Sequence, residues 1–324
     1  MLLTVRTGLL AAKMVFTATL LYVVFVNIEL KALWTIMLRA DLLFLGAAVF
    51  FYAMTFVVGG IRWYGINNAV GCGSSLSFCI RIFFVGGFFS QFLVGGGYGG
   101  DVYRIWVLAK HTGQKLRSFM AVFIDRASGF AGAILIVACL SPVYWFLFPN
   151  QKQIFITISL GCAVGAGILI LLAWVGKYRV RMGEEGDLAR SLFSRFKEIS
   201  HNLGKGFLSW PATGVHLGWS LIALLFNIFA MAAIGGALGV PIDFWAYLTL
   251  GPIVFLAKSF PLSLAGWGAR EVAMIYFFGF VNVDNASAIS MSVIAGVLVL
   301  VSSMPGGMLW LMNKDLKRSE GIPE

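Results

Sequence analysis

Long apolar runs separated by short polar loops constrain this chain more than any other feature. An α-helix needs about 20 mainly apolar residues to cross the roughly 30 Å of hydrocarbon in a bilayer. Charged residues make up only 12% of the sequence, which is about half of the share in a soluble domain. A soluble fold is therefore excluded, and we expect an all-α polytopic membrane protein with a single integral membrane domain over residues 1–324. About six full transmembrane helices are predicted, at residues 9–26, 42–61, 119–148, 154–175, 211–238 and 286–312.

Two further apolar segments contain interruptions that make them poor full spans. Arg81 and two glycines break residues 78–94, and a Gly-Pro pair and Lys258 break residues 244–260. We expect each segment to form one arm of a broken or re-entrant helical hairpin. Residues 244–260 are nevertheless long enough to cross the bilayer as a helix, so a crossing and a re-entrant path both stay open for them.

Each interrupted segment is followed by a similar glycine turn. Residues 96–101 are Gly-Gly-Tyr-Gly-Gly-Asp, and residues 265–270 are Ala-Gly-Trp-Gly-Ala-Arg. Irregular backbone at membrane depth is tolerated only where it is buried in protein or lines a cavity. Interrupted segments at corresponding places in two halves point to a transporter's binding site. The echo predicts inverted repeats at residues 42–148 and 212–312, with a chance match of six positions as the alternative.

Ionisable side chains at membrane depth are candidates for function because burying them is costly. Asp101 and Arg104 are three residues apart and can touch on a helix. Arg270 and Glu271 are adjacent and point about 100° apart, so we expect each to pair with another segment, for example Arg270 with Asp101 or Asp125. Helix-end ion pairs that fix topology are the alternative. The predicted substrate-binding residues are Gly97, Gly99, Asp101, Arg104, Asp125, Arg126, Lys258, Arg270 and Glu271.

The net charge of +10 comes from basic residues in the loops between apolar runs, so a nucleic-acid partner is not expected. Cytoplasmic loops of membrane proteins carry an excess of Lys and Arg. This rule places both termini and the basic segments 104–117, 177–205 and 314–318 on the cytoplasmic side of the inner membrane. Residues 177–210 are expected to form a cytoplasmic linker with an amphipathic helix, because apolar residues recur there at helical spacing.

No metal, cofactor or catalytic residue is predicted. The three histidines and four cysteines have no metal-ligand or redox spacing. A Gly-x-Gly-x-x-Gly pattern at residues 95–100 matches the dinucleotide fingerprint only formally, because no strand precedes it.

Three motifs together form a recognisable pattern. They are G-G-x-G-G-D-x-x-R at residues 96–104, an acid followed by arginine at 125–126, and P-x-S-x-x-G-x-G-x-R-E at 261–271. In these motifs the chain resembles the flippase-like membrane domain of bacterial lysylphosphatidylglycerol synthases and its stand-alone relatives. It departs from that pattern at Asp125, where glutamate is expected, and at Gln91 and Val94, where asparagine and proline are expected.

The resemblance implies lipid translocation or lipid-linked glycan assembly. It implies no synthase activity here, because no aminoacyl-transfer domain follows the last expected span. We expect a flippase-like transporter, rather than an enzyme, that moves an anionic phospholipid or polyprenyl-phosphate-linked lipid between leaflets. Arginines would hold the phosphate and acidic residues would balance them. A membrane-embedded transferase with a polyprenyl-phosphate donor and a non-catalytic partner of a glycosyltransferase are the alternatives, and a homo-oligomer also stays open.

The cytoplasmic placement of the basic linker can be tested by labelling Ser191→Cys in sealed cells. A membrane-impermeant maleimide should label this position only after the cells are opened, because the positive-inside rule keeps the linker in the cytoplasm. Labelling of intact cells would contradict the topology.

Overall fold

The computed structural model describes residues 35, 38–92, 98–177, 212–259 and 266–312 of the 324. All regular secondary structure in this part of the chain is helical. The predicted first span at 9–26 lies outside the described residues, as does the amphipathic linker helix beyond Lys177. The helices are α3 (Leu42–Ala69), α4 (Leu76–Phe92), α5 (Gly99–Thr112), α6 (Lys115–Leu147), η1 (Pro149–Gln151), α7 (Lys152–Lys177), α9 (Ala212–Ala237), α10 (Phe244–Ser259), α11 (Ala269–Phe278), η3 (Gly279–Val281) and α12 (Asn285–Met312).

Helix length and composition confirm a helical, multi-pass membrane protein. Four of the described helices, α3, α6, α9 and α12, are long and apolar enough to cross a bilayer. Helix α7 has 26 residues, as many as α9. The two interrupted segments form the shorter apolar helices α4 and α10, of 17 and 16 residues. The described helices therefore follow the order of the apolar runs, while their path through the membrane stays a prediction.

Helix α3 continues past residue 61, where the sequence places the end of the second span. It ends at Ala69, and Arg62 lies within it rather than at its end. The arginine is tolerated inside the helix because its guanidinium is buried against the carboxylate of Asp125. The helix therefore does not end at its charged residue, because a charged side chain inside a membrane protein is tolerated when it has a partner of opposite charge.

The chain forms two compact units. Unit 1 comprises Met1–Val58, Ile80–Tyr103 and Ala223–Glu324, and unit 2 comprises Gly59–Cys79 and Arg104–Ile222. The divisions fall within α3, α4, α5 and α9, so these helices contribute residues to both units.

Close backbone contact joins α12 to α4 and α3 in unit 1. A methyl group at Gly306 would overlap the carbonyl oxygen of Phe84 on α4. The hydroxyl of Ser302 donates a hydrogen bond to the carbonyl oxygen of Val49 on α3, at 3.2 Å. Small residues allow helices in membranes to approach in this way, because packing rather than the hydrophobic effect holds them together.

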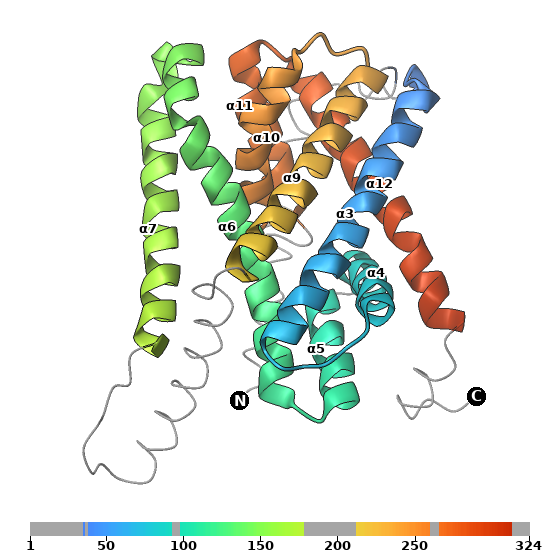
Figure 1. Ribbon diagram of the computed structural model, residues 1–324. Coiled ribbons are helices and arrows are strands. Elements are labelled where there is room, and N and C mark those ends of the chain that lie inside the picture. Colours follow the sequence, from blue (N-terminus) through green and yellow to red (C-terminus); the bar gives the residue numbers. More distant parts are fainter. Residues whose placement is uncertain (1–34, 36–37, 93–97, 178–211, 260–265, 313–324) are drawn as a thin grey trace, which may run out of the picture. The chain divides into compact units, whose positions relative to one another are not determined.

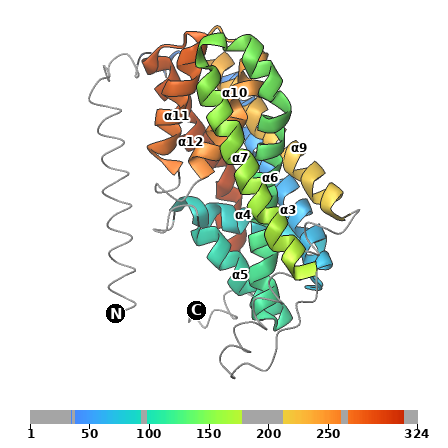
Figure 2. The ribbon, with the colours of Figure 1, turned by 90° about the vertical axis from the view of Figure 1, so that its left-hand side faces the viewer.

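Helices α10, α11 and α12 of unit 1 lie together in both ribbon views (Figures 1 and 2). Tyr247 of α10 packs on Phe278 of α11 with ring centroids 5.6 Å apart. Ile289 of α12 is buried against Ile275 of α11. This packing fixes the short helix α11, which begins within the second glycine motif, between two longer helices.

Asp284 fixes the start of α12, outside the apolar part of that helix. Its Oδ1 accepts a hydrogen bond from the backbone N–H of Ser287 at 2.9 Å, as a helix N-cap does. Burial raises the pKa of the Asp284 carboxyl, but hydrogen bonds from Ser287 and neighbouring backbone outweigh it and hold the pKa below its ordinary value. The cap sets the register of the helix that carries Ser292 and Gly296.

In unit 2, α6 and α7 form a helical hairpin joined by η1 (Figure 1). Tyr144 of α6 stacks on Phe155 of α7 at 4.5 Å between ring centroids, with the rings 9° from parallel. Phe148 stacks on the same ring at 5.1 Å. Earlier along α6, a side chain at Gly132 would lie 2.9 Å from Cβ of Ser220 on α9. Aromatic rings therefore pack α6 against α7, and small residues allow α6 to approach α9.

The contact between α12 and α4 predicts a strong effect of one methyl group. Gly306→Ala should lower the thermal unfolding midpoint in detergent micelles by several degrees, because forced overpacking of a core costs about 1–3 kcal/mol. The matched control is Gly46→Ala in α3, where nothing lies within 4 Å of the added carbon. Equal midpoints for the two variants would show that the helices do not approach this closely.

Candidate functional site

The second glycine motif forms a tight turn that needs its glycines. Gly266 and Gly268 have φ values of +82° and +85°, a region that side chains disfavour. A side chain at Gly266 would also lie 3.1 Å from the carbonyl oxygen of Lys258, at the end of α10. Glu271 accepts a hydrogen bond at Oε2 from the Gly268 N–H at 2.5 Å. The turn therefore brings the end of α10 against the start of α11.

Arg270 is held on three sides. Its Nη2 lies 3.0 Å from Oε1 of Glu271, and its Nε donates to the hydroxyl of Ser292 on α12 at 2.7 Å. The Ser292 hydroxyl donates in turn to Oε1 of Glu271 at 2.8 Å, and the guanidinium lies 4.8 Å from the ring centroid of Trp267. The expectation that adjacent Arg270 and Glu271 would pair better with other segments than with each other is wrong. Both side chains form hydrogen bonds with the hydroxyl of Ser292, and this shared partner orients them toward each other.

Gly296 on α12 makes room for this arrangement. A side chain there would lie 2.6 Å from Nη2 of Arg270 and 2.8 Å from the ring of Trp267. Arg270 and Glu271 are both buried, at 8% and 0% exposed. A buried ion pair of this kind is stable only when further hydrogen bonds satisfy its polar atoms, and Gly268 and Ser292 supply them here.

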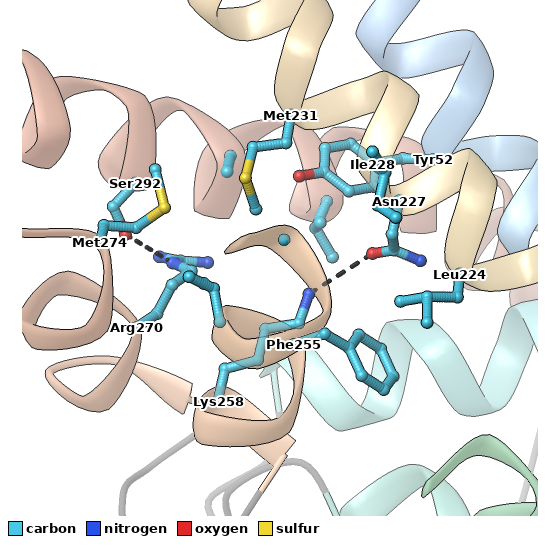
Figure 3. Close-up of a pocket in the computed structure, with 14 residues that line it drawn as sticks. Tyr52, Leu224, Asn227, Ile228, Met231, Phe255, Lys258, Arg270, Met274 and Ser292 are labelled. Carbon is cyan, nitrogen blue, oxygen red and sulfur yellow. Dashed lines mark hydrogen bonds between the residues drawn. The ribbon is translucent and has the colours of Figure 1, made fainter. Parts of the chain in front are cut away.

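A small cavity in unit 1 lies beside this ion pair (Figure 3). Arg270 and Ser292 line it on one side, and Lys258 lines it from the end of α10. The ammonium of Lys258 donates to Oδ1 of Asn227 on α9 at 3.4 Å and lies 5.2 Å from the ring centroid of Phe255. The remaining lining residues are mostly apolar: Tyr52, Leu224, Ile228, Met231, Gly251, Val254, Met274, Ala295 and Val299.

The cavity is narrow in this conformation. It leaves about 20 Å³ for the centre of a water-sized sphere, which is enough for about one water molecule. It therefore admits one oxygen-sized group, and a larger ligand requires the lining to open. Apolar walls with a few convergent polar groups are typical of ligand sites.

A second buried charge cluster lies in unit 2. Asp125 on α6 accepts from Nε of Arg62 at Oδ1 and from Nη2 of Arg104 at Oδ2, each at 2.8 Å. Asp125 is 2% exposed. The Arg104 guanidinium lies 4.4 Å from the centroid of Trp63, and Arg62 also donates to the Ser220 hydroxyl at 3.0 Å. One carboxylate therefore divides its two oxygens between two arginines.

His216 lies on α9, one helical turn before Ser220 of this cluster. The sequence favours a satisfied packing histidine in this span. The imidazole is 2% exposed and lies 3.2 Å from the position of a side chain at Gly65. Within the described residues neither of its ring nitrogens has a hydrogen-bond partner, and the same is true of Nε1 of Trp63. It packs as predicted, but its polar atoms are not satisfied there.

The remaining predicted residues lie at the first glycine motif and beside Asp125. Gly97 lies outside the described residues, and Gly99 is the first residue of α5. Asp101 is buried in the first turn of α5, and Arg126 is half-buried. The carboxylate that forms an ion pair with Arg270 belongs to Glu271 rather than to Asp101. The structure brings Asp125 and Arg104 together in one cluster, and it brings Lys258, Arg270 and Glu271 together at the cavity.

Four residues of the two clusters carry no functional signal in the sequence. Arg62 resembles the end of a span, and Trp63 follows it in an apolar run. Asn227 and Ser292 are uncharged residues within predicted spans. Arg62 is 63 residues from its partner, so only the tertiary fold reveals the pair.

Comparison with known proteins identifies a family for most of the chain. The family model described as Lysylphosphatidylglycerol synthase TM region matches residues 10–306. No curated protein matches the chain. The matched range includes both charge clusters and both glycine motifs.

The Asp125 cluster predicts a large loss of stability when the carboxylate is removed. Asp125→Asn removes the carboxylate that binds both buried guanidinium groups, and breaking a buried pair costs about 3–5 kcal/mol. The thermal unfolding midpoint in detergent should fall strongly, whereas Asp243→Asn, at an exposed position, should leave it unchanged.

The triple variant Arg62→Met, Arg104→Met, Asp125→Leu should recover much of that stability, since it removes all three charges together. No recovery in the triple variant would show that the three side chains do not act as one electrostatic unit.

Proposed function

Because the chain belongs to the lysylphosphatidylglycerol synthase transmembrane-region family, we propose that it is a flippase-like transporter that moves an anionic lipid between the leaflets of the inner membrane. The head group is a phosphate-containing anion, and it binds at the cavity between Lys258 and Arg270. The two interrupted helices α4 and α10 act as re-entrant arms, and both termini face the cytoplasm.

The cavity beside Arg270 carries this proposal. Two basic side chains, Lys258 and Arg270, line one apolar-walled cavity among membrane helices. Ionisable residues inside membranes are expensive and mark substrate or ion pathways. Cations with apolar surroundings attract an anion more strongly than they would in water, because the local dielectric is low. A lipid phosphate is an anion already present at the membrane surface, from which it could reach such a cavity.

Transport can be measured with purified protein in vesicles that contain a trace of phosphatidylglycerol with a fluorescent acyl chain. Dithionite bleaches only the outer leaflet, so lipid movement appears as bleaching beyond the first half of the signal. The wild-type protein should move this lipid faster than protein-free vesicles do, and faster than it moves fluorescent phosphatidylcholine. Equal rates with and without protein would contradict the proposal.

Arg270 is the first residue to test in this assay. Arg270→Ala should slow lipid movement by on the order of ten-fold, because it removes one of the two positive charges that line the cavity and the ion pair with Glu271. Arg270→Lys should rescue poorly, because lysine lacks the planar fork that contacts Glu271, Ser292 and the Trp267 face.

Lys152→Gln is the control for the loss of one positive charge, since Lys152 is exposed at the start of α7 and is not among the residues that line the cavity. This variant should keep wild-type rates. Full activity of Arg270→Lys would contradict a role for the guanidinium geometry.

A further inference from the structure

We infer that the cavity selects a singly charged phosphodiester head group, and that Lys258 is the side chain that contacts its phosphate. This inference rests on the proposed function and names the class of lipid and the residue that recognises it. Arg270, in contrast, acts mainly as a positioning residue that is already committed to protein partners.

Among the described residues that line the cavity and pair with its lining, the charges do not balance. Arg270 and Lys258 supply two positive charges, and Glu271 supplies one negative charge through its ion pair with Arg270. Within the described residues, the carboxylate of Glu271 binds Arg270, Ser292 and the Gly268 N–H, and no carboxylate forms an ion pair with Lys258. One positive charge therefore stays uncompensated beside an apolar wall, which favours an incoming anion.

The cluster in unit 2 arranges the same kinds of charge differently. There too two cations share one carboxylate, but each oxygen of Asp125 binds one arginine at 2.8 Å. In the cavity of unit 1, both oxygens of Glu271 are taken by groups other than Lys258. Each arginine of the Asp125 cluster therefore has a direct ion pair with the carboxylate, whereas Lys258 has none among the described residues.

The contacts of Lys258 are weak enough to be exchanged. The hydrogen bond to Asn227 is long, at 3.4 Å, and the contact with Phe255 is to an aromatic face at 5.2 Å. An ammonium has three donors, so an incoming phosphate oxygen can bind while Asn227 stays in place. The flexible lysine side chain can also follow the ligand as the lining opens.

Charge and size together specify the ligand class. A phosphodiester carries one negative charge and neutralises the single excess positive charge. A fully ionised phosphomonoester carries two, and would leave one negative charge buried without a partner, which is costly. The cavity admits one oxygen-sized group in this conformation, which suits a single phosphate oxygen. A zwitterionic lipid would bring a second cation toward Lys258 and Arg270.

Lipid retention in native mass spectrometry tests the inference without relying on transport. The detergent-purified proteins are wild type, Lys258→Gln, Lys258→Arg and the charge-matched control Lys152→Gln, each mixed with the same concentration of palmitoyl-oleoyl phosphatidylglycerol. Lys258→Gln should retain on the order of ten-fold less lipid than wild type, since a charge-assisted hydrogen bond is lost. Lys152→Gln should match wild type, and Lys258→Arg should retain most of the lipid. Unchanged unfolding midpoints establish that the variants are folded.

The choice of lipid tests the charge class. Wild type should retain phosphatidylglycerol better than phosphatidic acid or phosphatidylcholine with the same acyl chains. Glycerophosphoglycerol, the same head group without chains, should not displace the lipid at equal concentration, and displacement would overturn a lipid ligand in favour of a soluble phosphodiester. Equal retention by wild type and Lys258→Gln, stronger retention of phosphatidic acid, or no retention by wild type would each overturn the inference.

The binding and transport results separate the two proposals. Lys258-dependent retention in a protein that does not move lipid in vesicles would support this inference and contradict the proposed function. Lipid movement by wild type with retention that does not depend on Lys258 would support the proposed function and overturn this inference.

Discussion

The cost of placing a charge inside a membrane protein organises this structure. Each buried carboxylate of the two clusters is surrounded by donors: Asp125 by two arginines, and Glu271 by Arg270, Ser292 and a backbone N–H. An unpaired charge in such surroundings would be strongly destabilising. The helices that carry these residues are therefore fixed relative to their partners within each unit. Glycine and serine at the contacts, such as Gly296 and Ser220, provide the space and the additional hydrogen bonds.

The two charge clusters use the same components in different ways. Each contains two cations, one carboxylate and a tryptophan whose face is covered by an arginine, at 4.4 Å for Trp63 and 4.8 Å for Trp267. A cation held over an aromatic ring keeps a favourable interaction while it is removed from water. In the Asp125 cluster both arginines bind the carboxylate directly. In the cavity beside Arg270 only the arginine does so, because Lys258 has an amide oxygen and an aromatic face as its partners in the described structure.

This difference gives the buried charges two separate roles. The Asp125 cluster ties α3, α5, α6 and α9 together within unit 2 and is expected to affect stability first. The Lys258 cavity combines residues from α9, α10, α11 and α12 in unit 1 and is expected to affect ligand binding first. Phosphate contact assigned to the arginines from the sequence thus shifts, in our proposal, to Lys258, which has no carboxylate partner among the described residues.

The sequence by itself determined the membrane class, the order of the helices and the two places where apolar segments are interrupted, because hydrophobic run length and glycine content are local properties. It also identified Gly266 and Gly268, whose positive φ values require glycine, and most of the charged residues in the two clusters. Only the tertiary structure decided which charges pair. Arg62 stays inside α3 because Asp125 lies 63 positions away in sequence but in contact in space, and Arg270 binds its neighbour Glu271 because Ser292 of α12 orients both. Such pairings depend on helix packing, which apolar periodicity does not encode.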